Sequence, residues 1–290
     1  MNKDAGKKYE TCSVVMAVYH ADKPEWFCEA IDSILNQTVK SNDIVIVRDG
    51  PVSDELESVL CEYEKGCQEV RIIRLEKNGG LGNALNIGIK EAKNELIARM
   101  DADDISVGNR FELQLVEFNK DPELTLLGGQ IAEFEGTVDN IVAHRIVPTE
   151  QEEIIKFSKR RNPFNHVTVM YKKGVIDNCS GYDEAVLRCE DYDLWMRVLS
   201  KNYIIKNLAK NLVYVRIDQN AMKRRGTVKS VKGNIKCRSH FHEMRYISRT
   251  DFMFGMLSQV SLLIIPASIA SPLFKVMRKV DVHVEGEDDA

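Results

Sequence analysis

Residues 13–35 read SVVMAVYHADKPEWFCEAIDSIL, and this stretch decides the fold class. Its first six residues, Ser13 to Val18, form an apolar run that is typical of a buried strand. Pro24 then opens a stretch with helical periodicity. The apolar residues of that stretch share one helical face: Phe27, Ile31, Ile34 and Leu35. The stretch therefore predicts a strand followed by a helix.

The same alternation continues to about residue 100. We expect further strands at 43–47, 70–75 and 96–100, separated by helices at 55–63 and 82–92. Short, continuously apolar strands between helices are typical of a parallel sheet that is covered on both faces. The first hundred residues therefore predict an open, doubly wound α/β unit.

From about Leu124 the pattern changes to shorter strands and mixed connections. We expect strands at 125–127, 141–146, 167–171, 203–205 and 212–215, and a helix at 191–199. This half has an α+β pattern. We expect it to complete the same domain and to form the other wall of a ligand-binding crevice, because ligands bind such sheets at the carboxyl ends of the strands.

Composition excludes several classes of protein. The 290 residues are 44% hydrophobic and 29% charged, with a formal net charge of −4, which is an ordinary globular composition and argues against a dedicated nucleic-acid binder. The seven cysteines are scattered and form no C-x-x-C pair, so we expect reduced thiols rather than disulfides or a zinc site. The first ten residues lack an apolar core, so we expect no signal peptide and a cytoplasmic location.

The run Arg99-Met100-Asp101-Ala102-Asp103-Asp104 ends the fourth expected strand. Three carboxylates in four residues repel one another, and a fold tolerates them best where a cation neutralises them. Mg²⁺ and Mn²⁺ prefer such oxygen ligands. The run predicts a divalent metal site. The alternatives are a solvated acidic turn and a helix N-cap, with Asp103 or Asp104 capping the helix that begins near Gly108.

A glycine-rich run extends from Asn78 to Gly88 between an expected strand and an expected helix. Its backbone N–H groups, near Asn78 and Gly80, could bind a diphosphate at the helix N-terminus. The G-x-G-x-x-G pattern of dinucleotide sites is absent because Leu85 stands at the last position, and no P-loop Lys-Ser/Thr pair follows. The run disfavours NAD and ATP, and a simple turn is the alternative.

Glu190 and Asp191 precede the helix expected at 191–199. A carboxylate here could deprotonate a hydroxyl nucleophile if it faces the metal site, whereas the alternative is a capping role at the helix N-terminus. We also expect His166 and Trp195 to contact substrate, with a structural hydrogen bond as the alternative for His166. No G-x-S-x-G motif of serine hydrolases is present.

The C-terminal part divides into a basic, an apolar and an acidic segment. Between Lys223 and Arg249 the only acid is Glu243. Four basic residues there share one helical face: Arg225, Lys229, Lys232 and Lys236. Residues 252–274 carry no charge, but their prolines and serines favour an interfacial or re-entrant helix over a membrane span. The alternative is a helical appendage packed on the domain or on a dimer partner.

Together these motifs resemble the family 2 glycosyltransferases, especially the bacterial branch that builds exopolysaccharide, capsule or O-antigen. The resemblance covers residues 11–217, and its motifs follow in the family order: 13–19, 30–38, 47–50, 78–88, 101–104 and 190–193. It implies a GT-A fold, a Rossmann-like three-layer αβα arrangement with a mostly parallel sheet, here followed by a C-terminal helical tail. It also implies a nucleotide-diphosphate sugar donor and inversion at the anomeric carbon.

The resemblance implies a role for individual residues. Ala17 and Tyr19 would line the base and ribose pocket, and Asp49 would bond the base. Asp101 would meet ribose or metal, and Asp103 would hold Mg²⁺ or Mn²⁺. Asp191 of the Glu190–Asp191 pair would be the general base.

We therefore expect a metal-dependent glycosyltransferase that adds one sugar to a polyprenyl-diphosphate-linked glycan at the inner face of the cell membrane. No Q-x-x-R-W motif of processive synthases follows the Glu-Asp pair. The expected segments are a catalytic domain at 1–217, a basic helical segment at 218–250, a membrane-associating segment at 251–280 and a disordered acidic tail at 281–290. The alternatives are a sugar-phosphate nucleotidyltransferase and a non-catalytic protein that binds nucleotide sugars or scaffolds an assembly.

Overall fold

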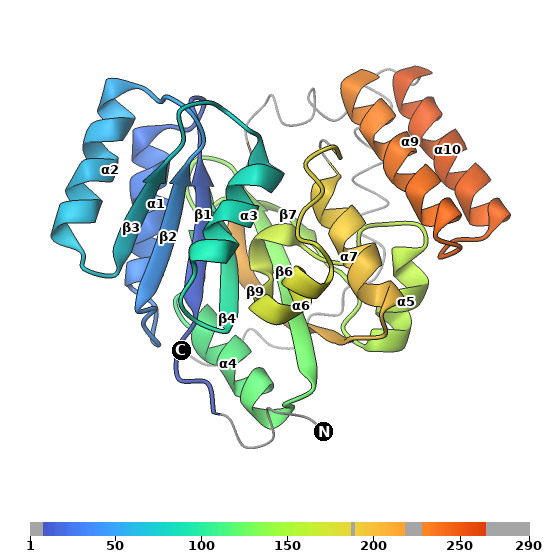
Figure 1. Ribbon diagram of the computed structural model, residues 1–290, viewed down its shortest axis with the longest axis horizontal. Helices are drawn as coiled ribbons and strands as arrows, with labels where there is room; N and C mark the ends of the chain where they lie inside the picture. Colours follow the sequence, from blue (N-terminus) through green and yellow to red (C-terminus); the bar gives the residue numbers. More distant parts are fainter. Residues whose placement is uncertain (1–7, 187–188, 218–227, 265–290) are drawn as a thin grey trace.

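The computed structural model describes residues 8–186, 189–217 and 228–264, and within them one nine-stranded sheet forms the centre of the molecule (Figure 1). The strand order is β3-β2-β1-β4-β8-β6-β9-β5, and β7 pairs with β6. The strands are β1 (Ser13–Val18), β2 (Asp43–Arg48), β3 (Val70–Arg74), β4 (Leu96–Asp101), β5 (Ile105–Ser106), β6 (Leu124–Phe134), β7 (Ile141–Arg145), β8 (Met170–Lys172) and β9 (Ile204–Arg216).

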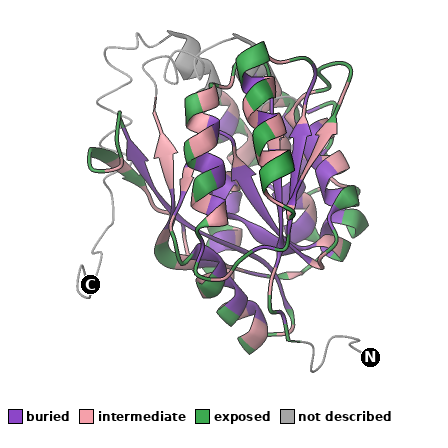
Figure 2. Ribbon diagram, turned by 90° about the vertical axis from the view of Figure 1, so that its left-hand side faces the viewer, coloured by how far each residue is buried: buried purple, intermediate pink, exposed green. Residues whose placement is uncertain are grey.

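Helices cover both faces of the sheet, so that buried strands lie between helices with exposed outer faces (Figure 2). Helices α1 (Pro24–Leu35), α2 (Asp54–Gly66) and α4 (Arg110–Lys120) contribute to the core on one face. Helices α3 (Leu81–Glu91), α5 (Gln151–Ser158), α6 (Lys173–Asn178) and α7 (Glu190–Ser200) contribute to the core on the other face. The side chains of β1 alternate accordingly, with Met16 in the first core and Val15 in the second. The expected three-layer αβα arrangement is confirmed.

The first half of the sheet is parallel, as the alternation of strands and helices predicts. β1 pairs in parallel with both β2 and β4, so Ala17 lies opposite Val47 on one side and opposite Asp101 on the other. The carboxyl ends of these strands therefore meet at one edge of the sheet. The first strand and the first helix have the bounds that residues 13–35 predict.

The second half of the sheet is mixed and departs from the expected elements. The strands expected at 203–205 and 212–215 are one strand, β9, which pairs in parallel with β6. The polar residues of 206–211 interrupt the apolar pattern, and pairing shifts near Gln130 accommodate them. The segment expected as a strand at 167–171 begins as a 3₁₀ turn, η1 (His166–Thr168), before β8.

Two further helices, α9 (Val228–Glu243) and α10 (Arg249–Ile264), lie side by side and pack beside α7 and α5 (Figure 1). No helix in the described ranges has both the length and the apolar composition that a bilayer crossing requires. Arg225, the expected acidic tail at 281–290 and the part of the expected apolar segment after Ile264 lie outside the described residues. All seven cysteines are free thiols, as expected.

Candidate active site

Asp49 holds the glycine-rich loop at the end of β2. Its two carboxylate oxygens accept hydrogen bonds from the backbone N–H groups of Gly79, at 2.7 Å, and Gly80, at 2.9 Å. Asn78 completes the contact by donating its side-chain amide to the Asp49 carbonyl oxygen at 3.1 Å. The carboxylate expected to bond a nucleotide base therefore also fixes the shape of the neighbouring loop.

Gly80 caps α3 with a φ of +88°, a backbone conformation that residues with a Cβ rarely adopt. Among the described residues other than its two chain neighbours, none has an atom within 4 Å of the position where a Cβ would stand, so the helix N-terminus is open on that side. A helix N-terminus attracts anions. The structure thus places Asn78 and Gly80 where a diphosphate could bind.

Other contacts near the same helix N-terminus bring distant motifs together. A Cβ on Gly82, in the first turn of α3, would lie 3.4 Å from Tyr182 Cβ and 4.0 Å from Glu190 Cβ. Asn86, one turn later, bonds both the N–H and the carbonyl of Tyr182, at 2.8 and 2.9 Å. The glycine-rich run and the Glu-Asp pair therefore border the same site, which their separation in sequence does not reveal.

Arg99 is a buried cation at the end of β4, with only 2% of its side chain exposed. Its guanidinium makes a bidentate pair with Asp101, at 2.7 Å for the Nη1–Oδ2 bond, while the second bond joins Nη2 to Oδ1. Bidentate pairs of this kind orient a carboxylate as well as neutralise it. Asp101 is therefore held in one orientation, opposite Ala17 on β1.

The ligand atoms of Asp101, Asp103 and Asp104 lie within 4.8 Å of one another. Burial and the charge of Asp101 raise the pKa of Asp103 to about 6, and burial together with both neighbouring acids raises the pKa of Asp104 well above its ordinary value. Burial also raises the pKa of Asp22, in the turn after Tyr19, to about 7, and the charges of Asp103 and Asp101 add to this rise. The raised pKa values mean that burial and mutual repulsion disfavour the ionised carboxylates, and a bound divalent cation would offset this cost. The cluster suits Mg²⁺ or Mn²⁺, because both ions prefer oxygen ligands.

Neither Asp103 nor Asp104 caps the following helix, which excludes the N-cap alternative. The N-cap of α4 is Asn109. The Asp104 carboxylate instead accepts the backbone N–H of Arg216 at 2.9 Å, and the Arg216 side chain donates to the Asp103 carbonyl at 3.1 Å. The end of β9 thus fixes the acidic loop.

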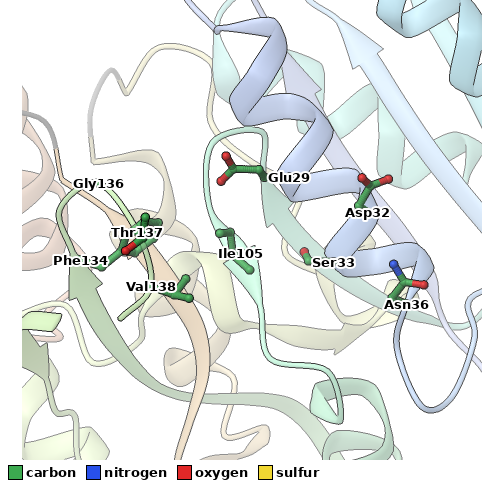
Figure 3. Close-up of a pocket in the computed structure, with 9 residues that line it drawn as sticks. All are labelled: Glu29, Asp32, Ser33, Asn36, Ile105, Phe134, Gly136, Thr137 and Val138. Atoms are coloured by element: carbon green, nitrogen blue, oxygen red, sulfur yellow. The ribbon is translucent and has the colours of Figure 1, made fainter. Parts of the chain in front are cut away.

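A pocket of about 510 Å³ lies beside this loop, between α1 and the residues that follow β6 (Figure 3). The Arg216 side chain links its two walls through an ion pair with Glu29 and a bond to the Gly136 carbonyl at 3.1 Å. None of the predicted site residues lines this pocket.

Asp191 lies in the first turn of α7, whose N-cap residue is Cys189. Its Oδ2 accepts the side-chain amide of Asn162 at 2.6 Å. Burial raises the pKa of Asp191, although the backbone N–H of Tyr192, the Asn162 bond and the nearby charges of Arg145 and Arg99 oppose the rise. The carboxylate is therefore oriented by its donors and poised to accept a proton.

Two buried polar atoms near Asp191 have no hydrogen-bond partner within the described ranges. They are Oε2 of Glu190 and Nε of Arg99. Burial and the charge of Asp191 raise the pKa of Glu190. Because buried polar atoms are almost always bonded, these two atoms indicate a place for a ligand hydroxyl or an ordered water.

His166 makes the structural hydrogen bond that was the alternative for it, and Trp195, which was expected to contact substrate, is instead fully buried. The His166 ring bonds the Tyr182 hydroxyl through Nε2 at 2.8 Å and lies 6.0 Å from the Trp195 ring. Burial and the charge of Arg99 lower the pKa of His166, so the ring is neutral. Trp195 is fully buried, and it supports His166 and Tyr182 from the core side.

Several residues that build the site were not predicted from the sequence: Arg99, Asn86, Asn162, Tyr182 and Arg216. Arg99 had a visible signal, because it is a lone cation in an otherwise apolar strand. Tyr19, which was predicted, is 41% exposed and lies edge-on to His20, with ring centroids 5.1 Å apart.

Comparison with known proteins identifies the family, because the family model described as Glycosyl transferase family 2 matches residues 13–189. The chain belongs to the family 2 glycosyltransferases. This membership confirms the resemblance in the motifs and makes the chain a glycosyltransferase rather than a sugar-phosphate nucleotidyltransferase.

Two relatives and one solved structure are similar to this chain along most of their own length. The Escherichia coli UDP-Gal:alpha-D-GlcNAc-diphosphoundecaprenol beta-1,3-galactosyltransferase is 36% identical over 91% of this chain and 94% of its own. The amylovoran biosynthesis glycosyltransferase AmsE of Erwinia amylovora is 32% identical over 84% of this chain and 90% of its own. The mannosyltransferase PcManGT of Pyrobaculum calidifontis, solved with GDP-Man and Mn²⁺, has a TM-score of 0.63 at 12% identity over 94% of this chain and 81% of that one. The fold is thus the expected GT-A fold.

Asp103→Asn tests the acidic cluster. Since the pKa of Asp103 is raised to about 6, its ionised form costs folding free energy at pH 7, and asparagine removes that cost. Without metal the variant should melt higher, by about 2–4 °C for each kcal/mol of repulsion removed. With MnCl₂ and UDP it should lose the further rise in Tm that the parent chain gains.

The control is Asp139→Asn, which removes an exposed acid outside the cluster and should change neither value. A full Mn²⁺-dependent rise in Tm in the Asp103 variant would contradict the metal assignment. Scanning calorimetry measures both quantities.

Proposed function

We propose that this glycosyltransferase transfers one sugar from a UDP-sugar to a hydroxyl of a lipid-diphosphate-linked glycan, with inversion and with a divalent metal. The observation that carries the proposal is the half-buried Asp191 carboxylate, which accepts the Asn162 amide and follows Glu190, whose Cβ lies near the first turn of α3. UDP and a diphosphate-linked acceptor are favoured by the 36% identical E. coli galactosyltransferase.

The donor would bind along the carboxyl ends of β1, β2 and β4. Ala17 and Tyr19 would border the base and ribose, and Asp101, oriented by Arg99, would meet a ribose hydroxyl. The diphosphate would lie at Gly80, where the helix N-terminus favours negative charge. Mg²⁺ or Mn²⁺ bound by Asp103, with Asp101 as a second ligand, would neutralise charge on the leaving diphosphate.

Asp191 would act on the acceptor. The Asp191 carboxylate would take the proton of the acceptor hydroxyl while the hydroxyl oxygen bonds to the anomeric carbon of the donor sugar. The bond between that carbon and the diphosphate would break on the opposite face of the sugar. Glu190 Oε2 and the neutral His166 ring would bond the hydroxyls of the sugars. Since no processive motif follows α7, we propose one transfer for each encounter.

The acceptor would be reached at the inner face of the membrane, on which the exposed side of α10 would lie. Met253, Phe254 and Leu257 are 55–67% exposed on that helix. Lys159 and Arg161, at the end of α5, are exposed, and Arg160 between them places its guanidinium 5.2 Å from the Phe254 ring. An apolar face beside basic residues matches an anionic lipid surface.

Asp191→Asn tests the base. Asparagine keeps the size of the side chain but accepts no proton, so kcat for transfer from UDP-galactose to a synthetic sugar-diphosphate-lipid should fall about 10²–10⁴-fold. The Kd for UDP with Mn²⁺ should stay within about twofold, because the donor residues lie on other elements. Glu184→Gln, at an exposed neighbouring acid, is the matched control.

The pH profile gives the same test a second readout. Because the pKa of Asp191 is raised by burial, kcat of the parent should fall with decreasing pH at a higher pH than an ordinary aspartate, near 3.9, would give. The variant should lack this acid limb. A variant that transfers sugar at the parent rate would show that Asp191 is not the base.

The membrane surface is tested by flotation with vesicles. The triple variant Met253→Ser, Phe254→Ser, Leu257→Ser should bind phosphatidylglycerol-containing vesicles at least about tenfold more weakly than the parent, since each exposed side chain contributes apolar burial. Val142→Ser, which removes a 45% exposed side chain on β7, should bind like the parent. Equal binding of parent and triple variant would refute this surface.

A further inference from the structure

Helix α9 contacts the part of α7 that carries the Glu-Asp pair. The Phe241 ring on α9 packs edge-on against Tyr192, with centroids 4.8 Å apart. Cys237 Sγ lies 3.8 Å from the carbonyl oxygen of Cys189, the N-cap residue of α7. Both α9 side chains are buried, at 0% and 1% exposure. The first turn of α7 is thus packed against α9.

Asp193 is the polar centre of this contact. Its carboxylate is fully buried and bonds Arg197 Nε, one turn along α7, at 2.8 Å. Its other oxygen, Oδ1, lies 2.7 Å from Nδ1 of His240 on α9. A buried carboxylate is stable only when both oxygens are satisfied. His240 therefore supplies a bond that this helix turn needs, two residues after Asp191.

Helix α9 and the turn that follows it also contact residues 158–162, the segment whose Asn162 bonds Asp191. Tyr246 bonds the Ser158 hydroxyl at 2.8 Å, and an Arg238 guanidinium nitrogen donates to the Arg160 carbonyl. Tyr192 adds a bond from its hydroxyl to the Ser158 carbonyl. This segment runs directly into Asn162, whose amide orients Asp191. The two chain segments that place the Asp191 carboxylate are therefore joined to each other through α9 and the turn that follows it.

We infer that α9 is a positioning element for the general base, and that His240 and Phe241 are its positioning residues. The inference rests on the proposed role of Asp191. Neither residue lies with the donor-binding strand ends, so their effect should reach the transfer step and leave donor binding unchanged. The C-terminal helices then serve catalysis as well as any attachment to a lipid surface.

The test compares His240→Ala with His240→Asn in the full-length chain. Alanine removes the bond to Asp193, whereas the asparagine amide can replace Nδ1 as a donor. For His240→Ala we expect kcat for transfer to the synthetic sugar-diphosphate-lipid to fall at least about tenfold, which corresponds to 1.4 kcal/mol. The Kd for UDP with Mn²⁺ should stay within about twofold, and His240→Asn should recover kcat to within about threefold of the parent.

Two further variants keep the test decisive. Phe241→Leu, which leaves the polar contact intact, covers the case in which the alanine variant does not fold, and it should lower kcat with unchanged donor Kd. Glu243→Gln is the control on the same helix, at an exposed position, and should behave like the parent.

An unchanged kcat in both His240→Ala and Phe241→Leu would overturn the inference. A parallel loss of kcat, donor affinity and Tm would also overturn it, because that pattern indicates a purely structural role. If Asp191→Asn is inactive while His240→Ala and Phe241→Leu are both fully active, only the positioning inference fails. If Asp191→Asn keeps full activity, the proposed function itself fails.

Discussion

The site depends on one ion pair at the end of β4, between the buried guanidinium of Arg99 and the half-buried carboxylate of Asp101. Burying a guanidinium with 2% exposure is costly, and the paired and hydrogen-bonded carboxylate offsets that cost. The pair therefore fixes Asp101 at the edge where β1 and β4 end. The charge of Arg99 also opposes the raised pKa of Asp103, Glu190 and Asp191, so a single buried cation acts on both the donor side and the base side of the site.

The two halves of the chain meet through side chains that bond backbone groups. Asn86 on α3 bonds both backbone groups of Tyr182, and the backbone of Arg216 bonds Asp104. These bonds join the parallel first half, which carries the acids and the glycine loop, to the mixed second half, which carries Asp191. A third contact, between His240 and Asp193, joins α9 to α7, the helix that carries Asp191.

Sequence alone predicts the parts of this protein in which local pattern and tertiary environment agree. The strand and helix of residues 13–35 have their predicted bounds, because a doubly buried strand is uniformly apolar and a surface helix is periodic. The sequence predicts two strands where the structure has the single strand β9, because Lys206, Asn207, Lys210 and Asn211 interrupt the apolar pattern although they belong to one long ladder. Asn162 and His240 had no signal at all. Their importance comes from the distant residues they bond, Asp191 and Asp193, and no periodicity or spacing encodes such a contact.

In the proposed arrangement, Asp103 holds the metal at the donor diphosphate and Asp191 faces that donor as the general base. Anomalous diffraction from crystals grown with Mn²⁺ and UDP is the most direct test of this arrangement. We predict one manganese peak at about 2.1 Å from an Asp103 carboxylate oxygen, with the diphosphate in front of Gly80 and the open side of that diphosphate facing Asp191. A manganese peak away from the acidic cluster, or a diphosphate bound elsewhere than the N-terminus of α3, would contradict the account.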